Sequence, residues 1–501
     1  MTGTETLERP ETADKVEHFD VIIVGAGISG IGSAYHLQEQ CPDKSFLVLE
    51  KFDSFGGTWH MHKYPGVRSD SDLFTFGYRF KPWMSAPIAT ADEILKYMGE
   101  VIDDNDLAPH IRYSHKIEHA AWSSKDKKWT VDVVRLDTGE KRRFTTNFLW
   151  MCQGYYNQEQ GYTPEWDGMD KYKGQIVHPQ TWPEDLDYKG KKVVLIGSGA
   201  TAATVVPAMA DDTEHLTMVQ RSPTYFFPGQ NANELADLLR AVEVDPMIIH
   251  DIVRRVALFQ QQEINRRSVE EPEIVKQELL EGVRAFVGPD FDMDKHLTPK
   301  YRPWQQRLAF VPDGDLFKCI TDGKVSIETD TIECFTETGL KLSSGKEIEA
   351  DIIITATGFN LSVLGNIPFE VDGKPVNWPE TVTYRGMMFT GVPNLLWVFG
   401  YFRASWTLRV DLLGDYVCRL LKHMDEMGVK QVTPTIPDSL SDMKVGNWIQ
   451  EEDFNPNYLV RSMHVMPKAG NHPDWQHTQD YWREKDEIPA LDLDTEALVY
   501  S

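Results

Sequence analysis

The sequence is poor in cysteine, and its five cysteines are scattered along 501 residues. They are Cys41, Cys152, Cys319, Cys334 and Cys418, and no two are spaced as C-x-x-C or C-x-x-x-x-C. This spacing argues against a disulfide framework, a zinc site and a dithiol redox centre. We interpret the cysteines as small buried apolar residues, and we expect no metal site.

Basic residues are also fewer than acidic ones. The chain has 51 lysines and arginines against 77 aspartates and glutamates, which gives a formal net charge of −26. Such a surface repels phosphate backbones, so nucleic acid is not an expected partner. A local basic pocket for one small anion remains compatible with this composition.

Long apolar runs are absent too. The longest, such as NLLWVFGYF, are too short to cross a bilayer, so no transmembrane segment is expected. Residues 1–18 are polar and acidic and lack the apolar stretch of a signal peptide, which predicts a flexible arm. We therefore expect a cytoplasmic protein, while peripheral contact with a membrane surface stays open.

The sequence does contain two strand–glycine–helix units. Residues 19–40 read FDVIIVGAGISGIGSAYHLQEQ and are followed by KSFLVLEK; residues 191–211 read KKVVLIGSGATAATVVPAMAD and are followed by HLTMVQRS. In each, an apolar β-branched run meets a glycine loop, a helical pattern and a second apolar run. This order predicts an α/β fold with two Rossmann-like, dinucleotide-binding domains built on parallel sheets.

The spacing of the two units predicts that the second domain is inserted into the first. We expect the first domain at residues 19–155 and 350–501, and the second at 156–349. In each domain, the runs after the βαβ unit predict a short antiparallel meander that returns to a final strand ending at a glycine. Residues 232–290 are mostly helical by pattern and are interpreted as an insertion in the second domain.

The first glycine loop matches G-x-G-x-x-G through Gly25, Gly27 and Gly30. These glycines allow the tight turn, the close approach of a pyrophosphate and the packing of helix on strand. Glu50 ends the next strand, where a carboxylate binds a ribose hydroxyl. Together with Ser29 inside the loop, they form the predicted first dinucleotide site.

The second loop has the form G-x-G-x-x-A, with Gly197, Gly199, Ala200 and Thr201 as predicted contacts of the pyrophosphate. Its next strand ends in Arg221 and Ser222, with no acidic residue. An arginine there suits a 2′-phosphate, so this site should prefer NADPH to NADH. The pair of sites indicates FAD in the first, NADPH in the second and hydride transfer between them.

Two more segments carry a family resemblance. GGTWHMHKYPGVRSD, residues 56–70, fits [AG]-G-x-W-x4-[FY]-P-G-x3-D, and YKGQIVHPQTWP, residues 172–183, fits F-x-G-x3-H-x3-W-[PD] with Tyr172 in place of Phe. With both glycine loops, the chain resembles the class B flavoprotein monooxygenases of the Baeyer–Villiger type. The stretches HPQTWPEDLDY, PWQQRL and ADIIITATGFN are most similar to the ethionamide-activating branch of that family.

The resemblance implies an enzyme in which NADPH reduces FAD and O2 then gives a C4a-peroxyflavin. This intermediate converts a ketone to an ester or lactone and also oxygenates sulfides and thioamides. The resemblance places Arg307 and Asp70 at the active site, where a permanent guanidinium charge can stabilise negative oxygen. It also places Gly57, Thr58 and Trp59 among the contacts of the cofactors.

The segment from Tyr172 to Pro183 lies between the two predicted domains. We expect it to couple movement of the NADP domain to the active site through Gly174 and His178, with Trp182 as a packing anchor. The sequence departs from the family at Gln306, where many members have a lysine that reaches the 2′-phosphate. The departure leaves more of the predicted NADP preference to Arg221.

Two alternatives stay open. The first is an N- or S-oxygenating flavin monooxygenase, although Trp182 and Pro183 favour the ketone-oxidising type. The second is a non-catalytic FAD- and NADP-binding redox sensor. The presence of Asp70, Arg307 and both glycine loops argues against a sensor, because a sensor needs no oxygenating residues. His60 and His62 lack a nearby third ligand in the sequence and do not predict a metal site.

Overall fold

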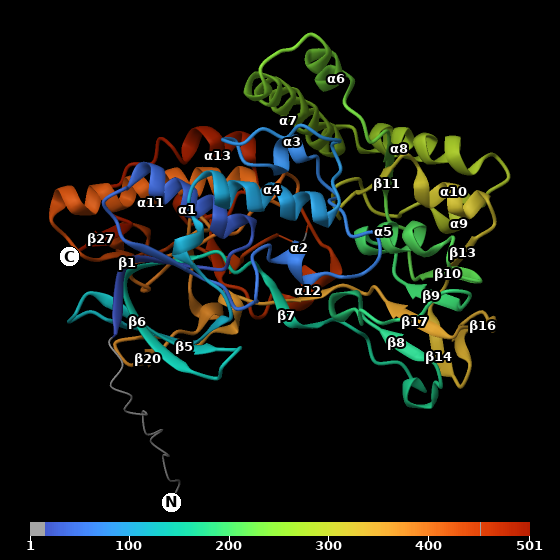
Figure 1. The fold of residues 1–501 in the computed structure, drawn as a ribbon, viewed down its shortest axis with the longest axis horizontal. Helices are drawn as coiled ribbons and strands as arrows, with labels where there is room; N and C mark the ends of the chain where they lie inside the picture. The colour runs from blue at the N-terminus through green and yellow to red at the C-terminus, as the bar shows by residue number, and fades with distance from the viewer. Residues whose placement is uncertain (1–15, 451) are drawn as a thin grey trace, which may run out of the picture.

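The computed structural model describes residues 16–450 and 452–501, which form two α/β units (Figure 1). Strand β1 (Glu17–Val24) begins inside the segment predicted as an arm, because Glu17 and His18 pair with Phe144 and Thr145. The predicted arm, residues 1–18, therefore runs too far at its C-terminal end. Its residues 1–15 lie outside the described part of the chain.

The first unit is built on a nine-stranded sheet with a parallel and an antiparallel part. The parallel part joins β1 to β2, β6 and, through them, β3 and β23, and the predicted antiparallel meander is formed by β4, β5 and β6. Besides β1, the strands are β2 (Phe46–Leu49), β3 (Ile111–Arg112), β4 (His115–Ser123), β5 (Lys128–Arg135), β6 (Lys141–Met151), β19 (Phe369–Val371), β20 (Lys374–Pro375) and β23 (Leu395–Trp397).

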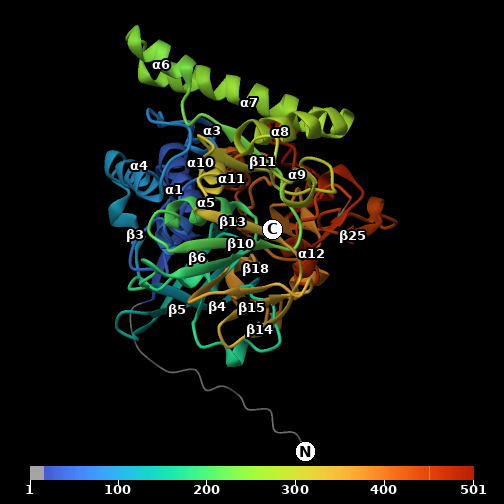
Figure 2. The ribbon, with the colours of Figure 1, turned by 90° about the vertical axis from the view of Figure 1, so that its right-hand side faces the viewer.

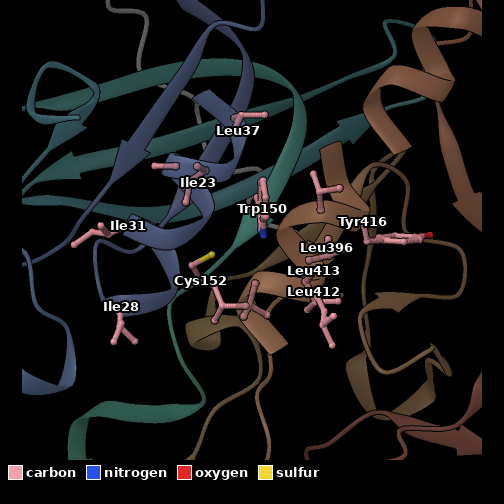
Figure 3. Packing of buried hydrophobic residues seen from close by; sticks show 14 of the residues in the cluster. Ile23, Ile28, Ile31, Leu37, Trp150, Cys152, Leu396, Leu412, Leu413 and Tyr416 are labelled. Atoms are coloured by element: carbon pink, nitrogen blue, oxygen red, sulfur yellow. The ribbon is translucent and has the colours of Figure 1, made fainter. Parts of the chain in front are cut away.

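Both faces of this sheet are buried at the parallel strands β1 and β2. Ile23 belongs to a core with α1 (Ile28–Gln40) and α11 (Trp406–Met427), whereas its neighbour Ile22 belongs to the core on the opposite face. Side chains of a strand alternate between faces, so a strand covered on both sides has a continuous apolar sequence. Figure 3 shows Ile23 and Leu413 among the residues of the helix-covered core. The continuous apolar run of β1 therefore follows from its burial on both faces.

The second unit has a five-stranded parallel sheet in the order β13-β10-β9-β17-β8. Its strands are β8 (Gln175–Val177), β9 (Lys192–Ile196), β10 (His215–Gln220), β13 (Val325–Thr329) and β17 (Ile352–Thr355), and α5 (Ala200–Met209) follows β9. The boundary predicted at residue 350 is wrong, because β17 pairs with both β9 and β8. The second unit therefore continues through residue 355.

The predicted meander of the second unit is also only partly right. Strand β13, expected as its first strand, pairs in parallel with β10 at the edge of the main sheet. The antiparallel strands are β14 (Ile332–Thr336), β15 (Gly339–Leu342) and β16 (Glu347–Glu349), which form a separate sheet. The apolar pattern identified these strands but could not specify their neighbours.

The predicted insertion at residues 232–290 is helical. It contains α6 (Glu234–Ala241), α7 (Pro246–Glu270) and α8 (Pro272–Val287), and α6 and α7 lie at one edge of the molecule (Figures 1 and 2). Asp245 caps α7 ahead of a proline at its first position, a favoured way to begin a helix. Arg254 of α7 then binds the first unit, donating to the carbonyl oxygens of Phe74, Thr75 and Gly77.

The chain passes between the units along two segments that lie side by side. Strand β7 (Tyr156–Gly161) leads out of the first unit and pairs antiparallel with β18 (Phe359–Leu361), which leads back to it. This arrangement brings the ends of β6 and β17 to the junction of the two sheets. None of the described helices is long and apolar enough to cross a membrane.

Candidate active site between the two sheets

A cavity of about 1370 Å³ lies at the junction of the two units. Most of the residues predicted from the sequence as cofactor contacts or catalytic groups line it. They are Gly25, Gly27, Ser29, Glu50, Gly57, Thr58, Trp59, Asp70, Gly197, Gly199, Ala200, Thr201, Arg221, Ser222 and Arg307. Gly30, Gly174, His178 and Trp182 do not line the cavity.

The first glycine loop has the close packing that its pattern predicts. Gly25 has a φ of +100°, and a Cβ atom at Gly30 would lie 1.7 Å from the carbonyl oxygen of Gly25. Gly30 therefore acts by closing the loop against α1. Gly27 begins α1 without a side-chain cap, which leaves N–H groups of the first turn available to an anion. These features fit the pyrophosphate of FAD.

Glu50 is the buried carboxylate at the end of β2. Its two oxygens accept hydrogen bonds from the backbone N–H groups of Ala26, at 2.6 Å, and Phe52, at 2.9 Å. Burial raises the pKa of Glu50, and the two backbone hydrogen bonds oppose that rise. Each oxygen keeps a second acceptor site, so the geometry is compatible with the predicted bond to a ribose hydroxyl.

Ser29 connects the first loop to α11. Its hydroxyl accepts a hydrogen bond of 2.8 Å from Nε1 of Trp406, and the Trp406 ring stacks on Tyr155 at 5.0 Å. All three residues line the cavity. Trp406 therefore belongs to the cavity wall beside the first dinucleotide loop.

The second glycine loop is open toward the cavity. Gly197 has a φ of +133°, and a Cβ atom there would lie 2.3 Å from the carbonyl oxygen of Ala356. Gly199 begins α5 without a side-chain cap, and a Cβ atom there would meet nothing within 4 Å. A backbone that is exposed in this way can approach a pyrophosphate closely.

Arg221 and Ser222 follow β10 and are exposed at the cavity. Among the described residues, no carboxylate lies within 4.0 Å of the Arg221 guanidinium. A cation without a carboxylate partner beside the ribose position suits a 2′-phosphate. The position is therefore compatible with the preference for NADP that the sequence suggested.

Arg307 and Asp70 come from different units and form a two-point ion pair at the cavity. Nε of Arg307 lies 2.7 Å from Oδ2 of Asp70, and Nη2 lies 2.8 Å from Oδ1. Burial lowers the pKa of the guanidinium, but Asp70 and three nearby tyrosines outweigh burial and raise it above its ordinary value. Arg307 is therefore permanently charged, and its orientation is held by a planar pair.

Sequence reasoning missed the three tyrosines around this ion pair, Tyr155, Tyr156 and Tyr458. The hydroxyls of Tyr155 and Tyr156 are 2.6 Å apart, and the Tyr156 and Tyr458 rings meet edge to face at 6.1 Å. Burial raises the pKa of all three phenols, so they are neutral hydrogen-bonding groups. The double tyrosine that follows Gly154, shortly after the end of β6, was a usable signal for the first two.

The connector from Tyr172 to Pro183 lies outside the cavity but contacts both crossing segments. His178 hydrogen bonds through Nε2 to the carbonyl oxygen of Gly358, at 3.1 Å, and its ring packs on Gly161. Trp182 packs against the core of the second unit. A Cβ atom at Gly174 would lie 2.3 Å from the carbonyl oxygen of Asp351, which explains the glycine.

Comparison with known proteins shows the family to which the chain belongs. Residues 23–84 match the model "NAD(P)-binding Rossmann-like domain", and residues 78–278 match "Flavin-binding monooxygenase-like". The FAD-containing monooxygenase EthA of Mycolicibacterium smegmatis is 44% identical over 97% of both chains. The chain belongs to the FAD-containing monooxygenase family. The probable FAD-binding monooxygenase AlmA of Acinetobacter baylyi is 42% identical over 97% of this chain and 96% of its own.

Solved structures confirm the predicted fold of this monooxygenase. An oxidized steroid monooxygenase bound to NADP superposes with a TM-score of 0.74 at 23% identity, covering 96% of this chain and 99% of its own. An open form of cyclohexanone monooxygenase also gives 0.74, at 19% identity, and covers 97% and 100%. At these identities the likeness concerns the fold. The matched family models confirm the two predicted cofactor classes, a flavin and a nicotinamide dinucleotide.

Proposed function

We propose that this monooxygenase is a Baeyer–Villiger enzyme that uses NADPH and O2 to convert ketones to esters or lactones. The observation that carries the proposal is the Arg307–Asp70 pair, held at the cavity between the two dinucleotide loops. The overall reaction takes a ketone, O2, NADPH and a proton to an ester, NADP⁺ and water. Sulfides and thioamides are proposed as further substrates.

Bound FAD would supply the activation of oxygen, and the residues of this chain would hold and polarise the reactants. The fixed charge of Arg307 stabilises the negative oxygen that develops when the substrate carbonyl is attacked. Asp70 keeps the guanidinium oriented through two hydrogen bonds, so little reorganisation is needed during the reaction. The neutral phenols of Tyr155, Tyr156 and Tyr458 would offer further hydrogen-bonding groups beside this pair.

We further propose NADPH as the preferred reductant, with Arg221 and Ser222 beside its 2′-phosphate. Support comes from their position after β10 and from the lack of a described carboxylate near Arg221. His178 and Trp182 are proposed to couple the second unit to the site, because the connector contacts both crossing segments. A cytoplasmic location is also proposed, since all five cysteines are free thiols.

The test uses purified enzyme loaded with FAD, together with NADPH, O2 and a panel of ketones and thioethers. We expect ester or lactone from the ketones, and an Arg307→Ala variant that binds FAD but forms no ester. Arg284→Ala, on the exposed face of α8, is the matched control and should behave as wild type. Oxidation of thioethers without any ester from ketones would instead identify an S-oxygenating monooxygenase.

A further inference from the structure

A second arginine faces the nucleotide side of the cavity from a part of the chain remote from either glycine loop. Arg461 lies on α12 (Asn457–Ser462), which is anchored to the first unit by buried Leu459. Its guanidinium carbon is 3.5 Å from the centre of the Tyr162 ring. Arg461 lines the same cavity as Arg221 and the loop of Gly197 and Gly199.

The stacked arrangement leaves the hydrogen-bond donors of Arg461 available. A guanidinium that stacks on a ring uses its face, while its five N–H groups point outward in the plane. Within the described protein, the side chain donates one hydrogen bond, a long one of 3.4 Å from Nη2 to the carbonyl oxygen of Phe359. No described carboxylate lies within 4.0 Å of the group. The donor edge of Arg461 therefore lacks the acceptor that a buried or half-buried guanidinium normally has.

The electrostatics of Arg461 also favour an anion beside it. Burial lowers the pKa of Arg461, the Tyr162 ring opposes this effect, and the positive charge of Arg221 lowers the pKa further. Two like charges are thus close enough to interact across the cavity, in a chain whose formal net charge is −26. An anion between them would remove this repulsion.

We propose that Arg461 binds a phosphate group of the nicotinamide dinucleotide, opposite Arg221. The planar N–H fork of arginine matches the geometry of phosphate oxygens and can form two parallel hydrogen bonds. Because α12 packs on β18, the segment that leads back to the first unit, and Leu459 of α12 lies in the core of that unit, this contact would tie the nucleotide of the second unit to the first. The proposal rests on the second site holding NADP.

Two phosphates of NADP share this chemistry. Bound in the predicted way, NADP would place its 2′-phosphate at the end of β10, beside Arg221, and its pyrophosphate at the start of α5. The second position is on the side of the Gly358 backbone, which approaches Nη2 of Arg461. NADP⁺ carries both groups, whereas NAD⁺ carries only the pyrophosphate. Comparing the two nucleotides therefore separates the two sources.

The experiment measures the Kd of NADP⁺ and of NAD⁺ for the oxidised, FAD-loaded enzyme by calorimetry, without turnover. The variants are Arg461→Gln, Arg461→Lys and, as a matched control outside the cavity, Arg284→Gln. Flavin content and Tm are recorded for each variant. Loss of a hydrogen bond to a charged group corresponds to a Kd raised about 10- to 150-fold. We expect that rise for Arg461→Gln, a smaller one for Arg461→Lys and none for the control.

The Kd values of the two nucleotides test both the contact and the phosphate that makes it. A higher Kd for NADP⁺ with an unchanged Kd for NAD⁺ supports the proposal and assigns the 2′-phosphate. An equal rise for both supports it and assigns the pyrophosphate. An unchanged Kd for both nucleotides in Arg461→Gln with wild-type flavin content overturns it. Wild-type enzyme that binds neither nucleotide would refute the cofactor assignment itself, which is a distinguishable failure.

Discussion

The Asp70→Asn variant tests how Arg307 is held in place. The two side chains are joined by contacts of 2.7 and 2.8 Å, and an asparagine of the same shape keeps one oxygen acceptor but presents an amide to the other N–H. One charge-assisted hydrogen bond is therefore lost, at a cost of about 1.5–3 kcal/mol. If the loss falls on the transition state, at 1.36 kcal/mol per factor of ten, ester formation slows roughly 10- to 150-fold.

The assay is single-turnover ester formation after rapid mixing, together with the ratio of ester to NADPH oxidised. We expect the rate and the ratio to fall while FAD stays bound, and hydrogen peroxide to make up the difference. Asp474→Asn is the matched control, because Asp474 pairs with Arg385 at 2.5 Å outside the cavity. Wild-type rate and coupling in a folded Asp70→Asn enzyme would refute the positioning role of Asp70.

Three further variants address the cofactor preference, the connector and the insertion. Arg221→Gln should raise the KM for NADPH about tenfold or more and leave that for NADH unchanged, because only NADPH has the 2′-phosphate; equal effects would count against the assignment. His178→Ala should lower the yield of ester per NADPH, and unchanged coupling would remove its role. In the insertion, His250 of α7 is buried and its Nδ1 accepts a hydrogen bond from the backbone N–H of Trp83. Burial lowers the pKa of His250 from 6.5 to about 4, so the folded state favours the neutral ring. Below pH 6.5 the unfolded chain binds a proton at His250 that the folded protein does not. The free energy of unfolding therefore falls by up to roughly 3 kcal/mol as the pH drops from 6.5 toward 4. In urea unfolding at pH 7 and pH 4.5, His250→Gln should show a smaller loss of free energy of unfolding than wild type. The same loss as in wild type would contradict the role of His250.

The sequence predicted those parts of the site whose residues lie close together along the chain. A strand, a tight glycine turn and a helix N-terminus lie within a dozen residues, so Gly25 and Gly197 could be placed from their own surroundings. Arg307 and Asp70 needed the family resemblance. Nothing in their neighbouring residues shows that two segments from different units form one ion pair.

The parts that were missed depend on tertiary contacts. The apolar run of β17 is typical of a buried strand, yet only its pairing with β9 and β8 assigns it to the second unit. Tyr458 and Arg461 lie one helical turn apart on α12, a spacing that places both on one face. That this face meets the cavity follows from the packing of α12 on β18, which no local pattern indicates.

The most direct test of the account is the fate of ¹⁸O2 during turnover of a ketone with NADPH. A Baeyer–Villiger reaction inserts one atom of O2 beside the carbonyl and releases the other as water, so mass spectrometry should find one ¹⁸O in each ester. The Arg307→Ala enzyme should bind FAD and yield no labelled ester. If wild-type enzyme consumed NADPH and converted all of the ¹⁸O2 to hydrogen peroxide across the ketone panel, the proposed function would be wrong.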